Sequence, residues 1–117
     1  MKFICLICAE TAMEQMAPAD AEAHFQEYAE FTADIKRKDH FIGANRLTPA
    51  DTAITVRVRN GKVSTTDGPY VETKEQLGGY YLINAKDLND AVQVASRIPG
   101  AKHGTIEVRP IMEFNQP

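Results

Sequence analysis

The residues best suited to chemistry in this sequence form one short turn, Asp67, Gly68, Pro69 and Tyr70. Glycine and proline restrict the backbone of a turn, so they can hold the Asp67 carboxylate and the Tyr70 ring beside one another at a strand end. A carboxylate held in this way can act as a general base, a general acid or a hydrogen-bond acceptor. The alternative is that Asp67 accepts hydrogen bonds from the amides of its own turn and only stabilises it. Both roles stay open on the sequence.

Two glycines, Gly78 and Gly79, follow this turn and open a strand-like run. Glycine inside a strand indicates a bulge or the close approach of another backbone, and it also leaves space for a ligand. We therefore predict Asp67 as the catalytic residue. The predicted ligand contacts near the turn are Asp67, Tyr70, Gly78 and Gly79.

Charged residues alternate with apolar ones in two other strand-like runs, at Arg57, Arg59, Glu107 and Arg109. Alternation points such side chains to one face of a sheet, where they form ion pairs in solvent or line a cleft between subunits. Arg109 is also a predicted ligand contact, because a guanidinium can bind an anionic group with two parallel hydrogen bonds.

The cysteines and histidines lack the patterns of redox and metal sites. Cys5 and Cys8 have C-x-x-C spacing, but they lie in a strand pattern that points them to opposite faces, so we expect free packing thiols. His24, His40 and His103 do not have metal-ligand spacing. The sequence also lacks a nucleophile elbow, a phosphate-binding glycine loop and a dinucleotide fingerprint. We expect neither a metal nor a tightly bound cofactor.

Two amphipathic helices are expected to support the turn. The first covers residues 18–38, opens with Pro18 near its start, and has its apolar stripe at Phe25, Tyr28, Phe31, Thr32 and Ile35. The second covers residues 88–98, with Asp87 as its N-cap, and its inward residues are expected to be Ala91, Val92, Ala95 and Ile98.

Strand-like runs and a hairpin complete the pattern, and one further strand starts at Phe41, after the first helix. Residues 3–9 and 79–83 are apolar almost throughout, which indicates strands buried on both faces, whereas residues 54–59 and 105–109 alternate. The dipeptide at residues 60–61 is Asn-Gly, a strong signal for a two-residue hairpin because both central positions need positive φ.

The order strand, helix, strand, hairpin, strand, helix, strand predicts a ferredoxin-like α+β fold with an added β-hairpin. Such a plan places both helices on one face of the sheet. The strand at residues 3–9 is apolar on the other face as well. We therefore predict a homodimer, in which a second subunit covers that face.

Composition limits the partner class. A chain of 117 residues with 44% apolar residues suits one domain over residues 1–117. The net charge of −3, with both signs interspersed, provides no positive field for nucleic acid. No run is long enough to span a membrane and the start does not resemble a signal peptide, so we expect a cytoplasmic protein.

Residues 66–83 resemble the signature of the DGPF, or YCII-related, family, and the resemblance extends through residues 2–9, 53–61 and 106–114. It implies a dimeric α+β barrel in which two sheets face each other. Tyr70 stands where the family usually has Phe.

A smaller branch of the YCII-related family, which this sequence resembles, is associated with a His and Asp dyad in and after the first helix. Alignment on the helix end places Tyr28 and Arg37 at those two positions, so we do not transfer the dyad's mechanism. Tyr28 is instead a predicted ligand contact. His24, one helical turn earlier, is either a spatial substitute or a surface histidine.

Three functional hypotheses follow. The first is a dimer that binds a small organic molecule near residues 67–70 and catalyses lyase- or isomerase-like acid/base chemistry, with Asp67 as base. The second, which rests on the resemblance, is a non-catalytic accessory or sensor module associated with an extracytoplasmic-function sigma factor. The third is a stable dimer in which the turn only builds the fold.

Overall fold

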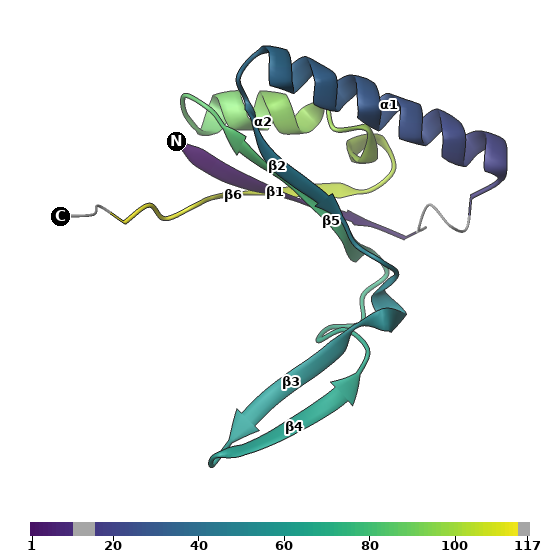
Figure 1. Ribbon diagram of the computed structural model, residues 1–117, viewed down its shortest axis with the longest axis vertical. Coiled ribbons are helices and arrows are strands. Elements are labelled where there is room, and N and C mark those ends of the chain that lie inside the picture. Colours follow the sequence, from purple (N-terminus) through teal and green to yellow (C-terminus); the bar gives the residue numbers. More distant parts are fainter. Residues whose placement is uncertain (11–15, 115–117) are drawn as a thin grey trace.

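The computed structural model describes residues 1–10 and 16–114, and its elements are drawn in Figure 1. The strands are β1 (Lys2–Ala9), β2 (Phe41–Arg46), β3 (Ile54–Arg59), β4 (Lys62–Asp67), β5 (Gln76–Asn84) and β6 (Thr105–Pro110). The α-helices are α1 (Pro18–Arg37) and α2 (Leu88–Ser96), and two short 3-10 helices are η2 (Ala50–Thr52) and η3 (Pro99–Lys102).

Four of the strands form one antiparallel sheet in the order β2-β5-β1-β6. Both α-helices pack on the same face of this sheet (Figure 1). The predicted ferredoxin-like α+β fold is therefore confirmed. β3 and β4 form a separate two-stranded sheet, which is the added hairpin.

The hydrophobic core lies between the helices and the sheet. The register pairs Phe3 with Ile83 and Cys5 with Tyr81, so all four side chains face the helices. Ile35 from α1 is completely buried against them. Burying an aliphatic or aromatic side chain of this size contributes about 1.5–3 kcal/mol. The core residues are Phe3, Cys5, Phe31, Ile35, Tyr81, Ile83, Ala85, Ala91, Val94, Ala95 and Ile98.

In each helix, one residue of the predicted apolar stripe is exposed instead of buried. In α1, Phe25 is 64% exposed, and the ring against Tyr28 is that of His24. In α2, Val92 is exposed and Val94 is buried instead. One residue corresponds to a rotation of about 100°, so Val92 lies well off the line of Ala91, whereas Val94, three residues after Ala91, returns close to it.

Local signals for helix ends and turns are confirmed. The Asp87 side chain accepts a hydrogen bond from the Asp90 amide (2.8 Å), as an N-cap does. Asn60 and Gly61 have φ of 52° and 75°, which suits the predicted hairpin turn. Asp39 also adopts a left-handed φ of 60° just after α1.

Cys5 and Cys8 are free thiols, as expected. Burial raises the pKa of Cys5 to about 11, so this thiol stays protonated. The pKa of Cys8 is raised by burial and then by the charges of Glu107 and Glu75. Neither environment favours a reactive thiolate.

The hairpin of β3 and β4, which we call the arm (residues 54–67), extends away from the rest of the chain. It projects from the side of the sheet opposite the helices (Figure 1). The Cα radius of gyration is 16.4 Å, compared with about 13 Å expected for a compact chain of this length. Among the described helices, none is both long and apolar enough to cross a membrane.

Candidate functional site

The turn at residues 67–70 is held at the base of the arm by its backbone. The Gly68 amide donates a hydrogen bond to the carbonyl of Ala53 (2.7 Å), and the Thr55 hydroxyl donates one to the carbonyl of Gly68 (2.9 Å). Gly68 has a φ of 102°, a conformation that glycine adopts without strain. The turn is therefore fixed to the start of β3.

The Asp67 carboxylate takes no part in holding this turn. Asp67 is exposed, and no hydrogen bond or ion pair of its side chain is found with residues 1–10 or 16–114. Its Cα pairs with that of Ile54, so the side chain lies on the same face of the arm as Ile54 and Val56. In this chain the carboxylate is free to meet a ligand or another subunit.

Tyr70 is 75% exposed and contacts a cation of the arm. The Arg57 guanidinium lies 5.4 Å from the centre of the Tyr70 ring, within the range of a cation–π contact. Arg57 lies on the opposite face of the arm from Asp67. The contact thus draws the ring toward the arm's polar face, and Asp67 stays on the apolar one.

Gly78 and Gly79 serve the pairing of three strands. Ile7 pairs with Gly79 and Cys8 with Leu77, so Gly78 is the extra residue of a bulge. A Cβ at Gly79 would lie 2.9 Å from the carbonyl oxygen of Asn45 on β2. The predicted bulge and close backbone approach are both confirmed, while a ligand contact at either glycine stays a prediction.

Tyr28 lies on the helix side of the sheet. Its hydroxyl accepts a hydrogen bond from the Gly100 amide (3.1 Å), and its ring stacks parallel to Tyr81 at 6.4 Å. Burial raises the pKa of Tyr28 to about 12, so the phenol stays protonated and can donate a hydrogen bond. A Cβ at Gly100 would lie 2.6 Å from this hydroxyl, so a side chain there would require the Tyr28 ring to shift.

The structure also brings together two histidines that the spacing did not associate. His24 packs edge-on against Tyr28 with ring centres 4.9 Å apart, and His103 lies 6.2 Å from His24. Burial is the main cause that lowers the pKa of His24, so this imidazole is neutral at pH 7. The signal in the sequence was the four-residue spacing of His24 and Tyr28. No group of three potential metal ligands lies together within residues 1–10 and 16–114.

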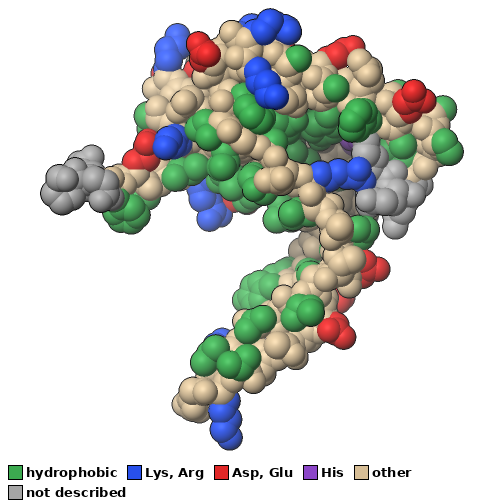
Figure 2. Space-filling view, in the orientation of Figure 1, with side chains coloured by type: hydrophobic (Ala, Val, Ile, Leu, Met, Phe, Trp, Pro, Cys, Tyr) green, Lys and Arg blue, Asp and Glu red, His purple; other side chains and the backbone are tan. Residues whose placement is uncertain are grey.

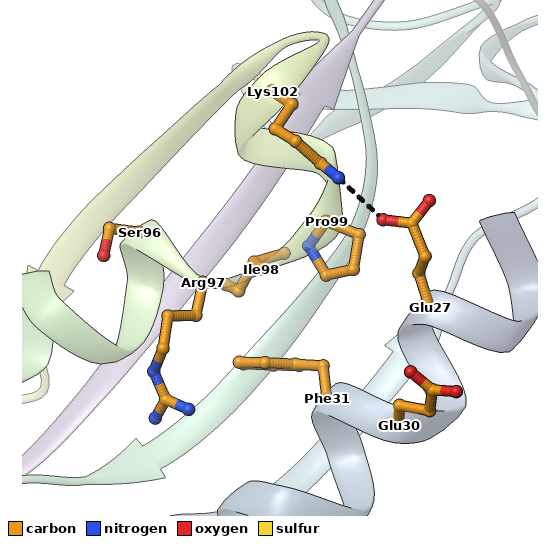
Figure 3. A pocket seen from close by; sticks show the side chains of 8 residues that line it. All are labelled: Glu27, Glu30, Phe31, Ser96, Arg97, Ile98, Pro99 and Lys102. Carbon is orange, nitrogen blue, oxygen red and sulfur yellow. Dashed lines mark hydrogen bonds and ion pairs between the residues drawn. The ribbon is translucent and has the colours of Figure 1, made fainter.

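A shallow groove of about 470 Å³ lies between α1 and the segment from α2 to η3 (Figure 3). Lys102 reaches across it to Glu27 (2.8 Å), and the Phe31 ring forms part of its floor. Arg97, also on its wall, is paired with Asp34. The two cations that line the groove are therefore already engaged by carboxylates of this chain.

Arg109 lies on the other face of the sheet from Tyr28. Its guanidinium pairs with Glu107 (2.7 Å), which confirms the ion-pair alternative for these two residues. The expectation that Arg57 and Arg59 share their sheet face is wrong, because β3 belongs to the separate two-stranded sheet.

The six predicted site residues therefore do not converge in one chain. Asp67 and Tyr70 lie at the base of the arm, close in sequence to the glycines near the start of β5. The Gln76 side chain links these parts, since its amide donates to the carbonyls of Val71 (3.1 Å) and Thr73 (2.9 Å). Tyr28 and Arg109 lie apart, on opposite faces of the four-stranded sheet.

Three features define a class of small α+β proteins. They are the ferredoxin-like sheet with two helices on one face, the added arm, and the turn Asp67-Gly68-Pro69-Tyr70, called the DGPY turn below. The chain matches the YCII-related domain family over residues 1–115 and belongs to that family.

Two comparisons extend this assignment. A solved structure of 5-chloro-2-hydroxyhydroquinone dehydrochlorinase from Burkholderia phenoliruptrix AC1100, in complex with 2,5-dihydroxybenzoquinone, superposes with a TM-score of 0.50. It is 13% identical, and the match covers 97% of this chain and 96% of that one, so the likeness shows the fold alone. An uncharacterized protein of Rhizobium meliloti (strain 1021) is 43% identical over 68 residues, a match that spans 56% of this chain and 55% of that protein.

Proposed function

We propose that this protein binds a small organic molecule at the DGPY turn and catalyses proton transfer or elimination on it, with Asp67 as general base. The observation that carries the proposal is the state of the Asp67 carboxylate. It forms no hydrogen bond or ion pair with the described residues, although hydrogen bonds hold the backbone of its turn. A general base must lie within hydrogen-bond reach of the proton that it abstracts, and this carboxylate is open to such a contact.

The proposed step is redox-neutral. Asp67 accepts a proton from the substrate, the electrons of the broken bond form a new double bond, and a leaving group departs with its own bonding pair. In an isomerisation the proton returns to another atom instead. Hydroxylated quinones and hydroquinones suit this chemistry, and the dehydrochlorinase with a similar fold acts on such a ring.

The other predicted contacts have separate places in the proposal. Tyr70 belongs to the turn, and Gly78 and Gly79 follow it in the sequence; all three are proposed to bind the body of the ligand. Arg109 is proposed to offer its guanidinium to an anionic group from the uncovered face of the sheet. Tyr28 would contact only a ligand that enters between α1 and the sheet.

We also propose that the protein is a homodimer whose sheets face each other. β1 carries apolar residues toward the side without helices, among them Ile4 and Leu6, and a second sheet would remove them from water. An accessory role beside a sigma factor is the alternative, and only the resemblance suggests it. A homodimer that binds a small molecule explains more of the observed geometry.

A thermal-shift experiment tests the ligand proposal. Wild type, Asp67→Asn and the control Asp51→Asn are compared with 2,5-dihydroxybenzoquinone, hydroxyhydroquinone and catechol. A ligand at 100 times its Kd adds about 2.7 kcal/mol, which raises Tm by several degrees for a domain of this size. Asp51 is also an exposed aspartate, in η2. We expect the shift in wild type and Asp51→Asn and its loss in Asp67→Asn.

Two results would contradict the proposal. If Asp67→Asn keeps the full ligand shift, the carboxylate is not the binding group. If Asp67→Asn without ligand melts far below Asp51→Asn, Asp67 is a structural residue. For any probe that shifts the Tm of wild type, turnover is measured separately by the absorbance of the quinone ring.

A further inference from the structure

The arm has an apolar face that the described residues of its own chain leave uncovered. Ile54, Val56 and Val58 alternate along β3, and Val63 pairs with Val58 on the same face. These four side chains are between 55% and 69% exposed. An isolated two-stranded hairpin is marginally stable in water, so this face gains stability from a covering surface.

The opposite face of the arm is cationic. Arg57 lies on this face, as do Arg59 and Lys62, which pair with each other. With Asp67 as its one acid, the arm carries a charge of +2, and the rest of the chain must carry −5 to give the total of −3. The arm and the rest of the chain therefore carry opposite net charges, which favours the approach of a second copy at long range.

The uncovered face of the four-stranded sheet meets the arm at an angle. Ile4 pairs with Leu82 and Leu6 with Tyr80 on this face, and all four are partly exposed. Hydrophobic side chains lie along the underside of the sheet and along the arm in Figure 2. Two apolar surfaces therefore border this angle, the helix-free face of the sheet and the apolar face of the arm.

We propose that a second copy of this chain fills the angle, so that the apolar face of each arm packs against the partner subunit. The inference rests on the homodimer proposed above and adds the arm as its clamp. Asp67 lies on this same face at the inner end of the arm. Its carboxylate is then at the subunit interface, and the partner forms part of the ligand site.

A second copy fits better than an unrelated partner for two reasons. A two-fold dimer uses both arms and both sheet faces, which helps to reach the roughly 800 Å² per subunit of a standard interface. The opposite net charges of the arm and of the rest of the chain also favour the approach of a second copy, while the cationic face of the arm stays in solvent. A different protein bound to the arm would not by itself explain the uncovered apolar face of the four-stranded sheet.

The experiment compares two double variants of the arm by sedimentation equilibrium. Val56→Lys with Val58→Lys places two cations on the apolar face, whereas Ser64→Lys with Thr66→Lys places two on the polar face. We expect the first to raise the dimer Kd by about 100-fold or more, since charges would be buried without partners. The control should change the Kd by less than about 3-fold. Far-UV circular dichroism should show equal secondary structure in both.

Three results would overturn the inference. The first is an unchanged Kd in the Val56→Lys, Val58→Lys variant, and the second is a wild type that is monomeric at about 100 μM. The third is a monomeric arm variant that binds 2,5-dihydroxybenzoquinone as tightly as wild type, which refutes the shared site. If the arm variant weakens the dimer while wild type binds none of the probes, the clamp is supported and the small-molecule function fails on its own.

Discussion

Asp34 joins the two helices through its carboxylate. It forms an ion pair with Arg97 just after α2, and with Lys38 (3.3 Å) and Arg37 (3.1 Å) at the end of α1. The hydrogen bonds from Arg97 and then Lys38 lower the pKa of Asp34 from 3.8 to about 2. The pairs are exposed, so their effect on stability is small.

The depressed pKa of Asp34 predicts a dependence of stability on pH. A carboxylate with a lower pKa in the folded state stabilises the fold above its unfolded pKa, and that stability is lost as pH falls from about 4 to about 2. We expect Asp34→Asn to lower Tm by about 1–3 °C at pH 7 and to match wild type at pH 2. Glu72→Gln, in an exposed loop, is the control. Scanning calorimetry showing an equal deficit at both pH values would contradict this.

The edge of the sheet depends on a close contact between β2 and β5. The missing side chain of Gly79 lets the Asn45 carbonyl and the Arg46 Cα approach, since a Cβ would lie 2.9 Å and 3.4 Å from them. Both are backbone atoms in a strand pair, so they cannot move without breaking that pair. β2 also leads to η2 and the arm.

This contact predicts that Gly79→Ala destabilises the protein by about 1–3 kcal/mol, the usual cost of overpacking. Gly78→Ala is the matched control, because a Cβ there would lie 3.9 Å from its nearest neighbour, the carbonyl of Ile7. Urea unfolding followed by circular dichroism measures both. Equal stabilities of the two variants would show that β2 and β5 move apart at little cost.

At the scale of the whole molecule, two apolar surfaces should behave differently. Leu6 lies on the sheet face without helices, and Phe25 lies on the outer side of α1. If the sheets of two subunits face each other, Leu6→Lys buries a charge at their interface, but Phe25→Lys places one in water.

We expect Leu6→Lys to be largely monomeric and Phe25→Lys to keep the wild-type oligomeric state. Size-exclusion chromatography with light scattering distinguishes them, and circular dichroism confirms that both fold. A dimer that survives Leu6→Lys and dissociates in Phe25→Lys would place the interface on the helix side.

The amino-acid sequence by itself determined the order of strands and helices, the fold class and the local turns. The Asp87 cap and the turn at Asn60 and Gly61 depend on residues within a few positions of each other, so short-range chemistry decides them. The helix ranges were also predicted closely, because apolar spacing follows the helical period over many turns. The DGPY turn was recognisable for the same local reason.

Only the tertiary structure decided which side chains meet. His24 and His103 are brought together by the packing of η3 on α1, which no local pattern encodes. The separation of Tyr28 from Arg109 follows from strand register, where a shift of one residue exchanges the two faces. The arm leaves the sheet because β2 pairs with the distant β5, while β3 and β4 pair with each other. These contacts join distant segments, and their geometry is set by the assembled sheet and helices.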